Sequence, residues 1–246
     1  MTLPTSASER PTLFIVGVRT LGRAIALHFA AQGWRVLCGA RTQSDVDQLA
    51  DDVTKAGGEG VAAVCDLQRP ESLLRVVQSQ PAIDLCVAAQ TAGGRFGAMP
   101  LVDLQEDELQ RGFDGYLRGT WNLLRAVGPA MLARERGTFL QIGTSSGVRS
   151  KAGYAALGAV QHGLRALVQV AAKEWRERGV HVAYLPIDGA IESPRTEAWV
   201  TRNGIGRAIP QASIAEACLF LYNQHPRGWT HELVLRPPAS DWSAPT

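Results

Sequence analysis

The stretch FIVGVRTLGRAIALHFAAQGWRVLCGAR, residues 14–41, contains two short apolar runs separated by a longer segment with helical spacing. Residues 12–16 and 35–40 are short and almost wholly apolar, which predicts buried strands. Residues 21–33 carry apolar side chains at helical intervals and end at Gly33, a residue type that often terminates a helix. Strand, crossover helix and strand together predict a βαβ unit, the building block of a parallel sheet.

The same alternation continues along the chain. It predicts further strands at 61–66, 83–89, 137–143, 181–186 and 231–237, and helices at about 43–56, 106–134, 153–178 and 213–224. Strands that are apolar throughout are typical of a sheet covered on both faces. We therefore predict an α/β fold over residues 1–246, a single Rossmann-type doubly wound parallel sheet of about seven strands with helices on both faces.

Three segments are expected to lie outside this regular frame. Residues 1–10 and 238–246 show no strand or helix pattern, so we expect them to be irregular. Residues 189–210 leave the carboxyl end of a strand, where open α/β sheets bind their ligands. That segment is the predicted substrate lid.

Composition argues against several classes of partner. The net charge is +2 without a long basic run, which argues against nucleic acid. No stretch approaches the roughly 18 apolar residues of a membrane span, and the N-terminal segment has no apolar signal core, so we expect a cytoplasmic protein. The cysteines lie mostly in apolar runs without metal-site spacing, so we expect buried thiols and no metal. They are Cys38, Cys65, Cys86 and Cys218.

Further segments carry a resemblance to a known family. CDLQ (65–68), GTFLQIGTSSG (137–147), VAYLPIDGAI (182–191) and WTHELVLRP (229–237) follow the first unit in order. With it they resemble the short-chain dehydrogenase/reductase family over nearly the whole chain, and a poorly characterised subgroup in the last two segments. The resemblance implies a small-molecule substrate. It also implies a homodimer or homotetramer formed through the helices 106–134 and 153–178.

The loop after the first strand departs from this family. The family's Gly-x-x-x-Gly-x-Gly lets the backbone approach a pyrophosphate at a helix N-terminus. Here the run from Gly17 to Gly22 is one residue shorter and lacks the middle glycine. Gly17 still permits a tight turn and Gly22 close packing of helix on strand, whereas bulk at the missing glycine would crowd the phosphates. An altered dinucleotide site and a plain strand–helix turn both remain open.

Two arginines favour a nucleotide with a 2′-phosphate. Arg41 ends the second strand, where an acidic residue would bind the ribose of NAD, and Arg19 lies nearby in the loop. NADP(H) is therefore the expected cofactor, although Arg41 is equally typical of a solvated strand end. The resemblance adds Asp66, beside an adenine, although an aspartate there is also a common turn former. The full expected set is Gly17, Arg19, Thr20, Leu21, Gly22, Arg41, Asp66, Leu67 and Ala88.

The end of the fourth strand departs as well. The family has Asn-Asn-Ala-Gly there, and this chain has Ala-Ala-Gln-Thr at 88–91. We therefore expect the side-chain amides that lock this strand end beside the cofactor to be absent.

The family's catalytic Asn, Ser, Tyr and Lys are replaced. An ungapped register places Tyr116, Thr144, Leu157 and Gln161 at these four positions. Thr144 keeps a hydroxyl that can hold a carbonyl oxygen. The lysine is lost, and with it the ammonium that lowers the pKa of a tyrosine from about 10. At about 4 Å and an effective dielectric of 20, that charge is worth roughly 4 kcal/mol.

A second register deletes three residues from the loop 145–152. It places Tyr154 in the tyrosine's role and Gly158 in the lysine's. The lysine is therefore absent in both registers. Lys151 lies before the helix and Lys173 more than three turns beyond Gln161. Losing the acid–base relay should reduce the rate roughly 10²–10⁴-fold.

Three functions follow from these departures. The first is a divergent enzyme that acts on a small organic molecule by non-redox proton transfer, such as isomerisation, cyclisation or dehydration. Thr144, Tyr154 and Tyr116 would be its catalytic residues, although both tyrosines are also compatible with simple helix packing. The second is an NADP(H)-dependent oxidoreductase with a substituted proton relay. The third is a non-catalytic ligand-binding or dimer-partner protein.

Overall fold

Six parallel strands form the central sheet, in the order β3-β2-β1-β4-β5-β6. The computed structural model describes residues 10–90 and 98–239. The strands are β1 (Thr12–Val16), β2 (Arg35–Ala40), β3 (Glu59–Val64), β4 (Leu85–Ala88), β5 (Gly137–Thr144) and β6 (Val180–Ile187). The order reverses direction between β1 and β4, which is where doubly wound sheets open a crevice for ligands. The predicted fold class is confirmed.

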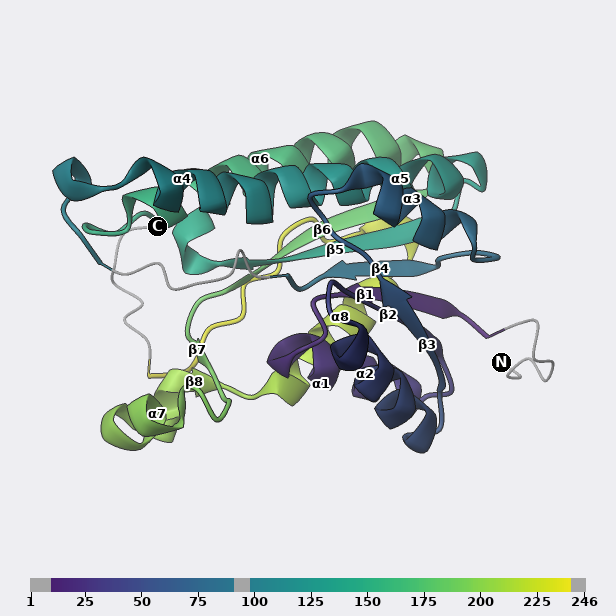
Figure 1. Ribbon diagram of the computed structural model, residues 1–246, viewed down its shortest axis with the longest axis horizontal. Coiled ribbons are helices and arrows are strands. Elements are labelled where there is room, and N and C mark those ends of the chain that lie inside the picture. Colours follow the sequence, from purple (N-terminus) through teal and green to yellow (C-terminus); the bar gives the residue numbers. More distant parts are fainter. Residues whose placement is uncertain (1–9, 91–97, 240–246) are drawn as a thin grey trace.

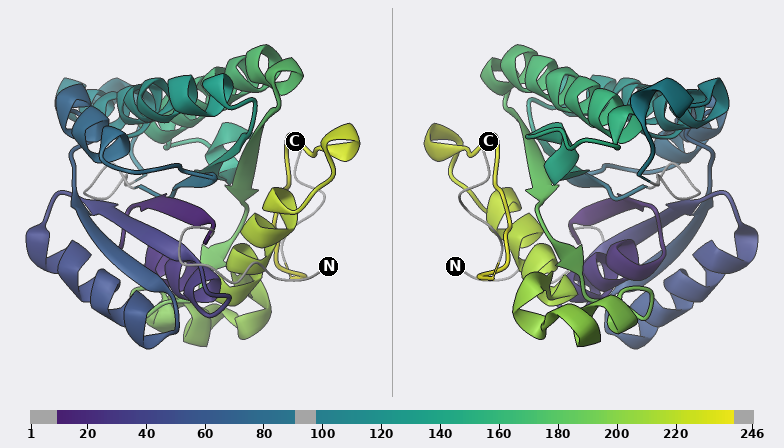
Figure 2. Two further views of the ribbon diagram at one scale, coloured as in Figure 1. Left: turned by 90° about the vertical axis from the view of Figure 1, so that its right-hand side faces the viewer. Right: turned by 90° about the vertical axis from the view of Figure 1, so that its left-hand side faces the viewer.

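Helices cover both faces of this sheet (Figures 1 and 2). One face carries α1 (Thr20–Ala30), α2 (Gln43–Lys55) and α8 (Gln211–Tyr222). The other carries α3 (Pro70–Gln78), α4 (Glu106–Gly112), α5 (Gly119–Ala133) and α6 (Ala155–Trp175). Sequence analysis missed α3, a helix of only nine residues that begins with a proline at its first position.

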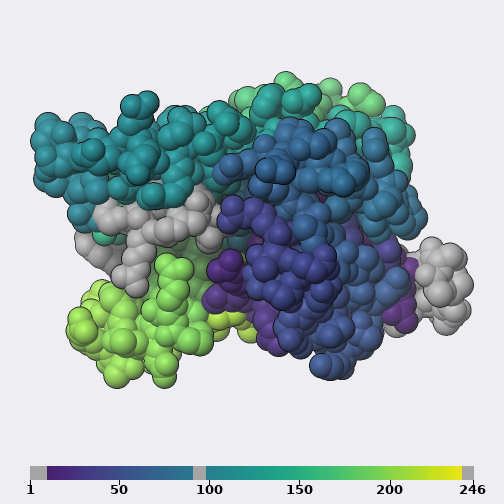
Figure 3. Space-filling view, in the orientation of Figure 1, coloured from purple at the N-terminus to yellow at the C-terminus, as the bar shows by residue number. Residues whose placement is uncertain are grey.

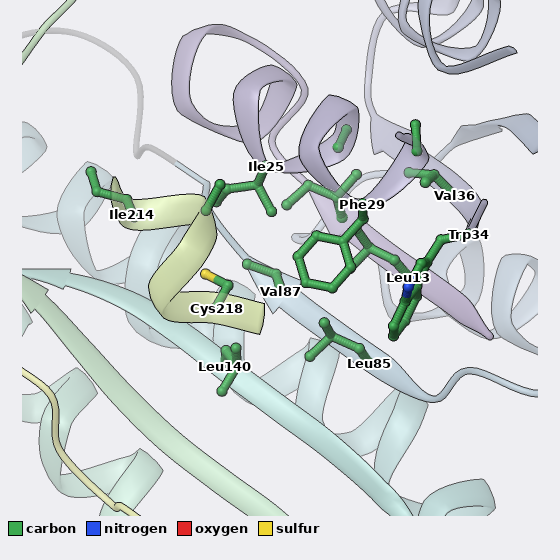
Figure 4. Packing of buried hydrophobic residues seen from close by; sticks show 14 of the residues in the cluster. Leu13, Ile25, Phe29, Trp34, Val36, Leu85, Val87, Leu140, Ile214 and Cys218 are labelled. Atoms are coloured by element: carbon green, nitrogen blue, oxygen red, sulfur yellow. The ribbon is translucent and has the colours of Figure 1, made fainter. Parts of the chain in front are cut away.

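The core beneath α1 and α8 is made of aliphatic and aromatic side chains that point from both helices onto the strands (Figure 4). Phe29 of α1 packs edge-on against Trp34, with ring centroids 4.8 Å apart. Cys218 of α8 lies in this core, and its burial raises the pKa of the thiol to about 12. All four cysteines are buried and free, which confirms the sequence-based expectation of buried thiols.

The segment 231–237 takes the place of the predicted seventh strand without becoming a regular one. It runs parallel to β6 and forms two isolated bridges with it. The Tyr184 N–H donates to the His231 carbonyl (2.8 Å), and the Leu235 N–H donates to the Pro186 carbonyl (3.2 Å). Pro186 accepts the second of these bonds but has no N–H of its own, so the ladder lacks one donor there.

The predicted helix 106–134 is interrupted. A π-helical turn, Phe113–Arg118, separates α4 from α5 and contains Tyr116. Glycines at 112, 115 and 119 weaken the local preference for a regular α-helix. Single π-helical turns inside helices are frequent at functional sites, so the interruption draws attention to Tyr116.

The predicted lid has secondary structure of its own. It contains β7 (Ala190–Ile191), α7 (Glu197–Asn203) and β8 (Ala208–Ile209), and β7 pairs with β8 as a small parallel sheet. In the space-filling view it forms a lobe at the same end of the molecule as α4 (Figure 3). Its role as a substrate lid stays a prediction.

Candidate functional site

The turn between β1 and α1 is shaped for a backbone-bound anion. Gly17 has φ +96°, and a Cβ added to it would lie 2.7 Å from the Ala89 carbonyl oxygen. Its N–H donates to the Gly39 carbonyl (3.0 Å). The next two N–H groups, of Val18 and Arg19, find no acceptor among residues 10–90 and 98–239. The turn thus presents free donors at the start of a helix, whose dipole favours anions.

Thr20 stands where the resemblance places the missing glycine. It has φ +36°, a left-handed conformation that favours glycine and is rare for a β-branched residue. Holding a residue there costs about 1–3 kcal/mol. The chain has therefore kept a glycine-type backbone conformation while adding a side chain, and the crowding near the phosphates stays a prediction.

The two arginines expected at a 2′-phosphate differ in their surroundings. Arg41 is exposed at the end of β2 and has no hydrogen bond or ion pair within the described part of the chain. Arg19 Nε lies 3.4 Å from Asp45 Oδ2, with 81% of its side chain exposed. An exposed pair of this kind is worth about 0–1 kcal/mol, so Arg19 can exchange Asp45 for another anion.

Asp66 forms hydrogen bonds within a turn. Its Oδ1 accepts from the Gln68 N–H (3.0 Å), and its own N–H donates to Ser72 Oγ (2.9 Å). The neighbouring Leu67 carbonyl accepts from Asn122 Nδ2 (2.8 Å). These bonds fit the turn-forming alternative, while the adenine contact stays a prediction.

Side-chain amides hold the end of β4 in place through hydrogen bonds. Gln90 Nε2 donates to Thr120 Oγ1 (2.7 Å), which donates to Gln141 Oε1 (2.8 Å). Gln141 Nε2 donates in turn to the Ala88 carbonyl (3.2 Å). The expected loss of locking amides is therefore wrong: two glutamines and a threonine, distant in sequence, perform that task from buried positions.

The expected catalytic residues lie on elements that pack together. Thr144 ends β5, and its Oγ1 accepts from the Ser146 N–H (3.2 Å) in the 3₁₀ turn Ser145–Gly147. α6 packs against that turn and against the π-helical turn that holds Tyr116. Tyr154 precedes α6 and lines a small hollow with Met99 and Glu108. The catalytic roles of Thr144, Tyr154 and Tyr116 stay predictions.

No hydrogen bond or ion pair joins Lys151 or Lys173 to the Tyr154 hydroxyl in the described part of the chain. Lys151 is exposed, and its carbonyl accepts a backbone hydrogen bond from the Tyr154 N–H (3.1 Å). Lys173 is exposed near the end of α6. The Tyr154 hydroxyl therefore has no ammonium partner among the described residues.

Gln161, at the lysine position of the ungapped register, forms a hydrogen bond with another buried residue of the chain. Gln161 is fully buried, and its Oε1 accepts from the Tyr184 hydroxyl (3.4 Å). A Cβ added to Gly143 or Gly147 would lie 2.2–2.3 Å from the hydroxyl oxygen of Tyr184. Burial raises the pKa of Tyr184, so the phenol stays neutral. Sequence analysis missed Tyr184; the signal was a large aromatic residue beside a strand rich in small residues.

A buried ionic cluster lies at the carboxyl ends of β5 and β6. Arg149 Nη2 donates to Asp188 Oδ1 (2.7 Å), and Arg236 Nε lies 2.6 Å from Asp188 Oδ2. The side chains are 12%, 7% and 9% exposed. Sequence analysis did not identify these residues, because each comes from a different segment.

Comparisons with known proteins agree on one family. The family model described as enoyl-(acyl carrier protein) reductase matches residues 16–234. An uncharacterized oxidoreductase of Listeria monocytogenes is 24% identical over 95% of this chain and 99% of its own length. The 3-oxoacyl-[acyl-carrier-protein] reductase FabG of Thermotoga maritima is 27% identical over 82% of this chain and 85% of its own.

Solved structures share the fold. A short-chain dehydrogenase from Rhodopseudomonas palustris has a TM-score of 0.77 at 24% identity, covering 92% of this chain and 98% of its own. A metagenomic short-chain oxidoreductase in complex with NADP has a TM-score of 0.74 at 24% identity, covering 94% and 98%. Within the described residues, no helix is long and apolar enough to cross a membrane.

These relatives overturn one expectation. Proteins that match most of this chain are named oxidoreductases and reductases. The expected non-redox proton-transfer chemistry is therefore wrong, and the alternative of a redox enzyme is the better supported one.

Proposed function

Because this chain belongs to the short-chain dehydrogenase/reductase family, we propose that it is an NADP(H)-dependent oxidoreductase with a substituted proton relay. Its substrate would be a small molecule with a carbonyl or alcohol group. The names of its relatives support the redox chemistry. The observation that carries the choice of cofactor is Arg41, exposed and without a partner in the described residues at the end of β2.

The residues at the β1–α1 turn fit a dinucleotide. The free N–H groups of Val18 and Arg19 would receive the pyrophosphate, and Gly17 leaves its approach open. Arg41, with Arg19, would hold the 2′-phosphate. The remaining expected contacts are Thr20, Leu21, Gly22, Asp66, Leu67 and Ala88. When bound, the nicotinamide supplies or accepts the hydride.

The chain's own residues would orient the substrate and move the proton. The Thr144 hydroxyl donates to the carbonyl oxygen, and a tyrosine hydroxyl, from Tyr154 or Tyr116, supplies the proton. Lys151 and Lys173 form no bond with the Tyr154 hydroxyl in the described residues, so a proton from Tyr154 would pass between neutral groups. We therefore expect turnover roughly 10²–10⁴-fold slower than with an intact relay.

Arg41→Ala tests the cofactor assignment. The variant should bind NADPH about 10–100-fold more weakly, since a charged hydrogen bond contributes about 1.5–3 kcal/mol. Binding of NADH should be unchanged, because it lacks the 2′-phosphate. Energy transfer from tryptophan to the reduced nicotinamide measures both affinities. Arg75→Ala, at an exposed arginine of α3, is the matched control. Equal losses for both cofactors, or no loss, would contradict the assignment.

The expected homo-oligomer has a suitable surface. Phe113, Trp121 and Val170 are exposed apolar residues around a hollow of about 510 Å³ between the π-helical turn, α5 and α6. An apolar patch of this kind is typical of a protein interface. We propose that a second copy of the chain covers it, in a homodimer or homotetramer.

A further inference from the structure

One of the two arginines expected at a 2′-phosphate already holds an internal carboxylate. Arg19 Nε lies 3.4 Å from Asp45 Oδ2, and neither side chain forms another hydrogen bond or ion pair within the described residues. The turn that carries Arg19 is joined to β2 by the bond from the Gly17 N–H to the Gly39 carbonyl (3.0 Å). Arg41, at the end of β2, has no partner among these residues. An anion that approaches this place therefore meets one free guanidinium and one that is already paired.

The position of Asp45 is fixed by the helix that carries it. α2 begins at Gln43, shortly after Arg41, and Asp45 lies in its first turn. The next residue, Val46, is fully buried in the core beneath α1 and α8, so this turn of the helix is anchored. A negative charge in the first turn is also stabilised by the helix dipole. Asp45 is therefore held beside the end of β2, where the 2′-phosphate is expected.

Arg19 can leave this ion pair more easily than Asp45 can move away. The Arg19 side chain is 81% exposed and the Asp45 side chain 35%. Arginine binds phosphate through strong charge-assisted hydrogen bonds, so Arg19 is expected to turn from the carboxylate to a 2′-phosphate. The Asp45 carboxylate then stays nearby without its partner and repels the phosphate, which carries about two negative charges at neutral pH. NAD(H) has an uncharged hydroxyl at that position and meets no such repulsion.

We propose that Asp45 is a specificity-determining residue, which competes with the 2′-phosphate for Arg19 and so weakens the binding of NADP(H) relative to NAD(H). This inference rests on the cofactor assigned in the proposed function, and it adds a residue that opposes the preference given by Arg41. Removing the charge of Asp45 should strengthen the binding of NADPH about 3–10-fold, through the ion pair that no longer has to be broken and the repulsion that is lost. The binding of NADH should change less than about twofold.

Asp45→Asn and a matched control variant test the competition. Asp47→Asn removes the same charge from the same helix, at an exposed residue whose carboxylate accepts from Gln43 Nε2 (2.8 Å) and has no arginine partner within the described residues. NADPH and NADH are titrated into each protein, and energy transfer from tryptophan to the reduced nicotinamide gives both dissociation constants. Asp45→Asn should raise the affinity for NADPH about 3–10-fold, and Asp47→Asn less than about twofold. Far-UV circular dichroism checks that the variants fold.

An Arg19→Gln background separates competition from simple repulsion. No ion pair has to be broken there, so the gain in NADPH affinity from Asp45→Asn should shrink at least about twofold. A gain that Asp47→Asn does not reproduce and that shrinks without Arg19 supports the inference, even when no carbonyl compound is reduced. An equal gain for NADH, no gain for NADPH, or an undiminished gain without Arg19 overturns it, even when hydride transfer is observed. Binding of NADPH without hydride transfer counts against the proposed function alone.

Discussion

Asp188→Asn is expected to lower the free energy of unfolding by about 3–5 kcal/mol, because it leaves two covered guanidinium groups without their shared carboxylate. Asparagine keeps the shape of the side chain, so the loss reports on charge rather than on packing. The Asp188 N–H also donates to the Leu235 carbonyl (2.8 Å), and this bond survives the substitution. Urea unfolding followed by far-UV circular dichroism measures the effect.

A surface ion pair provides the control for Asp188→Asn. Asp45 pairs with Arg19, whose side chain is 81% exposed, so Asp45→Asn should change stability by no more than about 1 kcal/mol. Equal effects of the two substitutions would contradict the description of the Arg149–Asp188–Arg236 cluster as a covered ionic centre.

Gly143→Ala is expected to destabilise the protein by about 1–3 kcal/mol or more, because the added methyl would lie 2.2–2.3 Å from ring and hydroxyl atoms of Tyr184. Tyr184 is fully buried, so its ring has little room to move away. In a Tyr184→Ala background the same methyl enters the space that the ring has left. There Gly143→Ala should be close to neutral or stabilising.

A double-mutant cycle measures this coupling. Tyr184→Ala alone should cost about 3–5 kcal/mol, the usual range for truncating a large buried aromatic residue. The coupling energy should be about 1–3 kcal/mol, with the double variant more stable than the sum of the single changes predicts. Additive effects would mean that Tyr184 does not fill the space beside Gly143, and the described packing of Tyr184 between Gly143 and Gln161 would then be wrong.

Local sequence patterns predicted the central sheet and most of its helices well. The strands at 12–16 and 35–40 have the predicted bounds, because each is an apolar run between clear turn residues. α3 was missed because a nine-residue helix offers little periodicity. The segment 231–237 has the apolar run of a strand, but Pro186 on the neighbouring strand removes a ladder donor. A local sequence pattern cannot show the effect of a residue on another strand.

The site was harder to predict because its parts are distant in sequence. The sequence offered Gln161 for the lysine position in one of two registers, but the pairing of Gln161 with Tyr184 depends on how β6 packs against α6. The lock formed by Gln90, Thr120 and Gln141 likewise joins three separate segments. Departures from the family's motifs could be read from the sequence. The residues that replace the contacts of those motifs could be identified only from the fold.

The central claim is that the chain transfers hydride without a lysine-supported tyrosine, and deuterium transfer tests it most directly. The protein is incubated with NADPH carrying deuterium at the transferred position, together with phenylglyoxylate, its methyl ester or levulinate, and the products are examined by mass spectrometry. We predict slow incorporation of deuterium at the former carbonyl carbon, lost in Thr144→Ala. NADPH that binds without passing deuterium to any of these compounds would contradict the account and favour a non-catalytic binding protein.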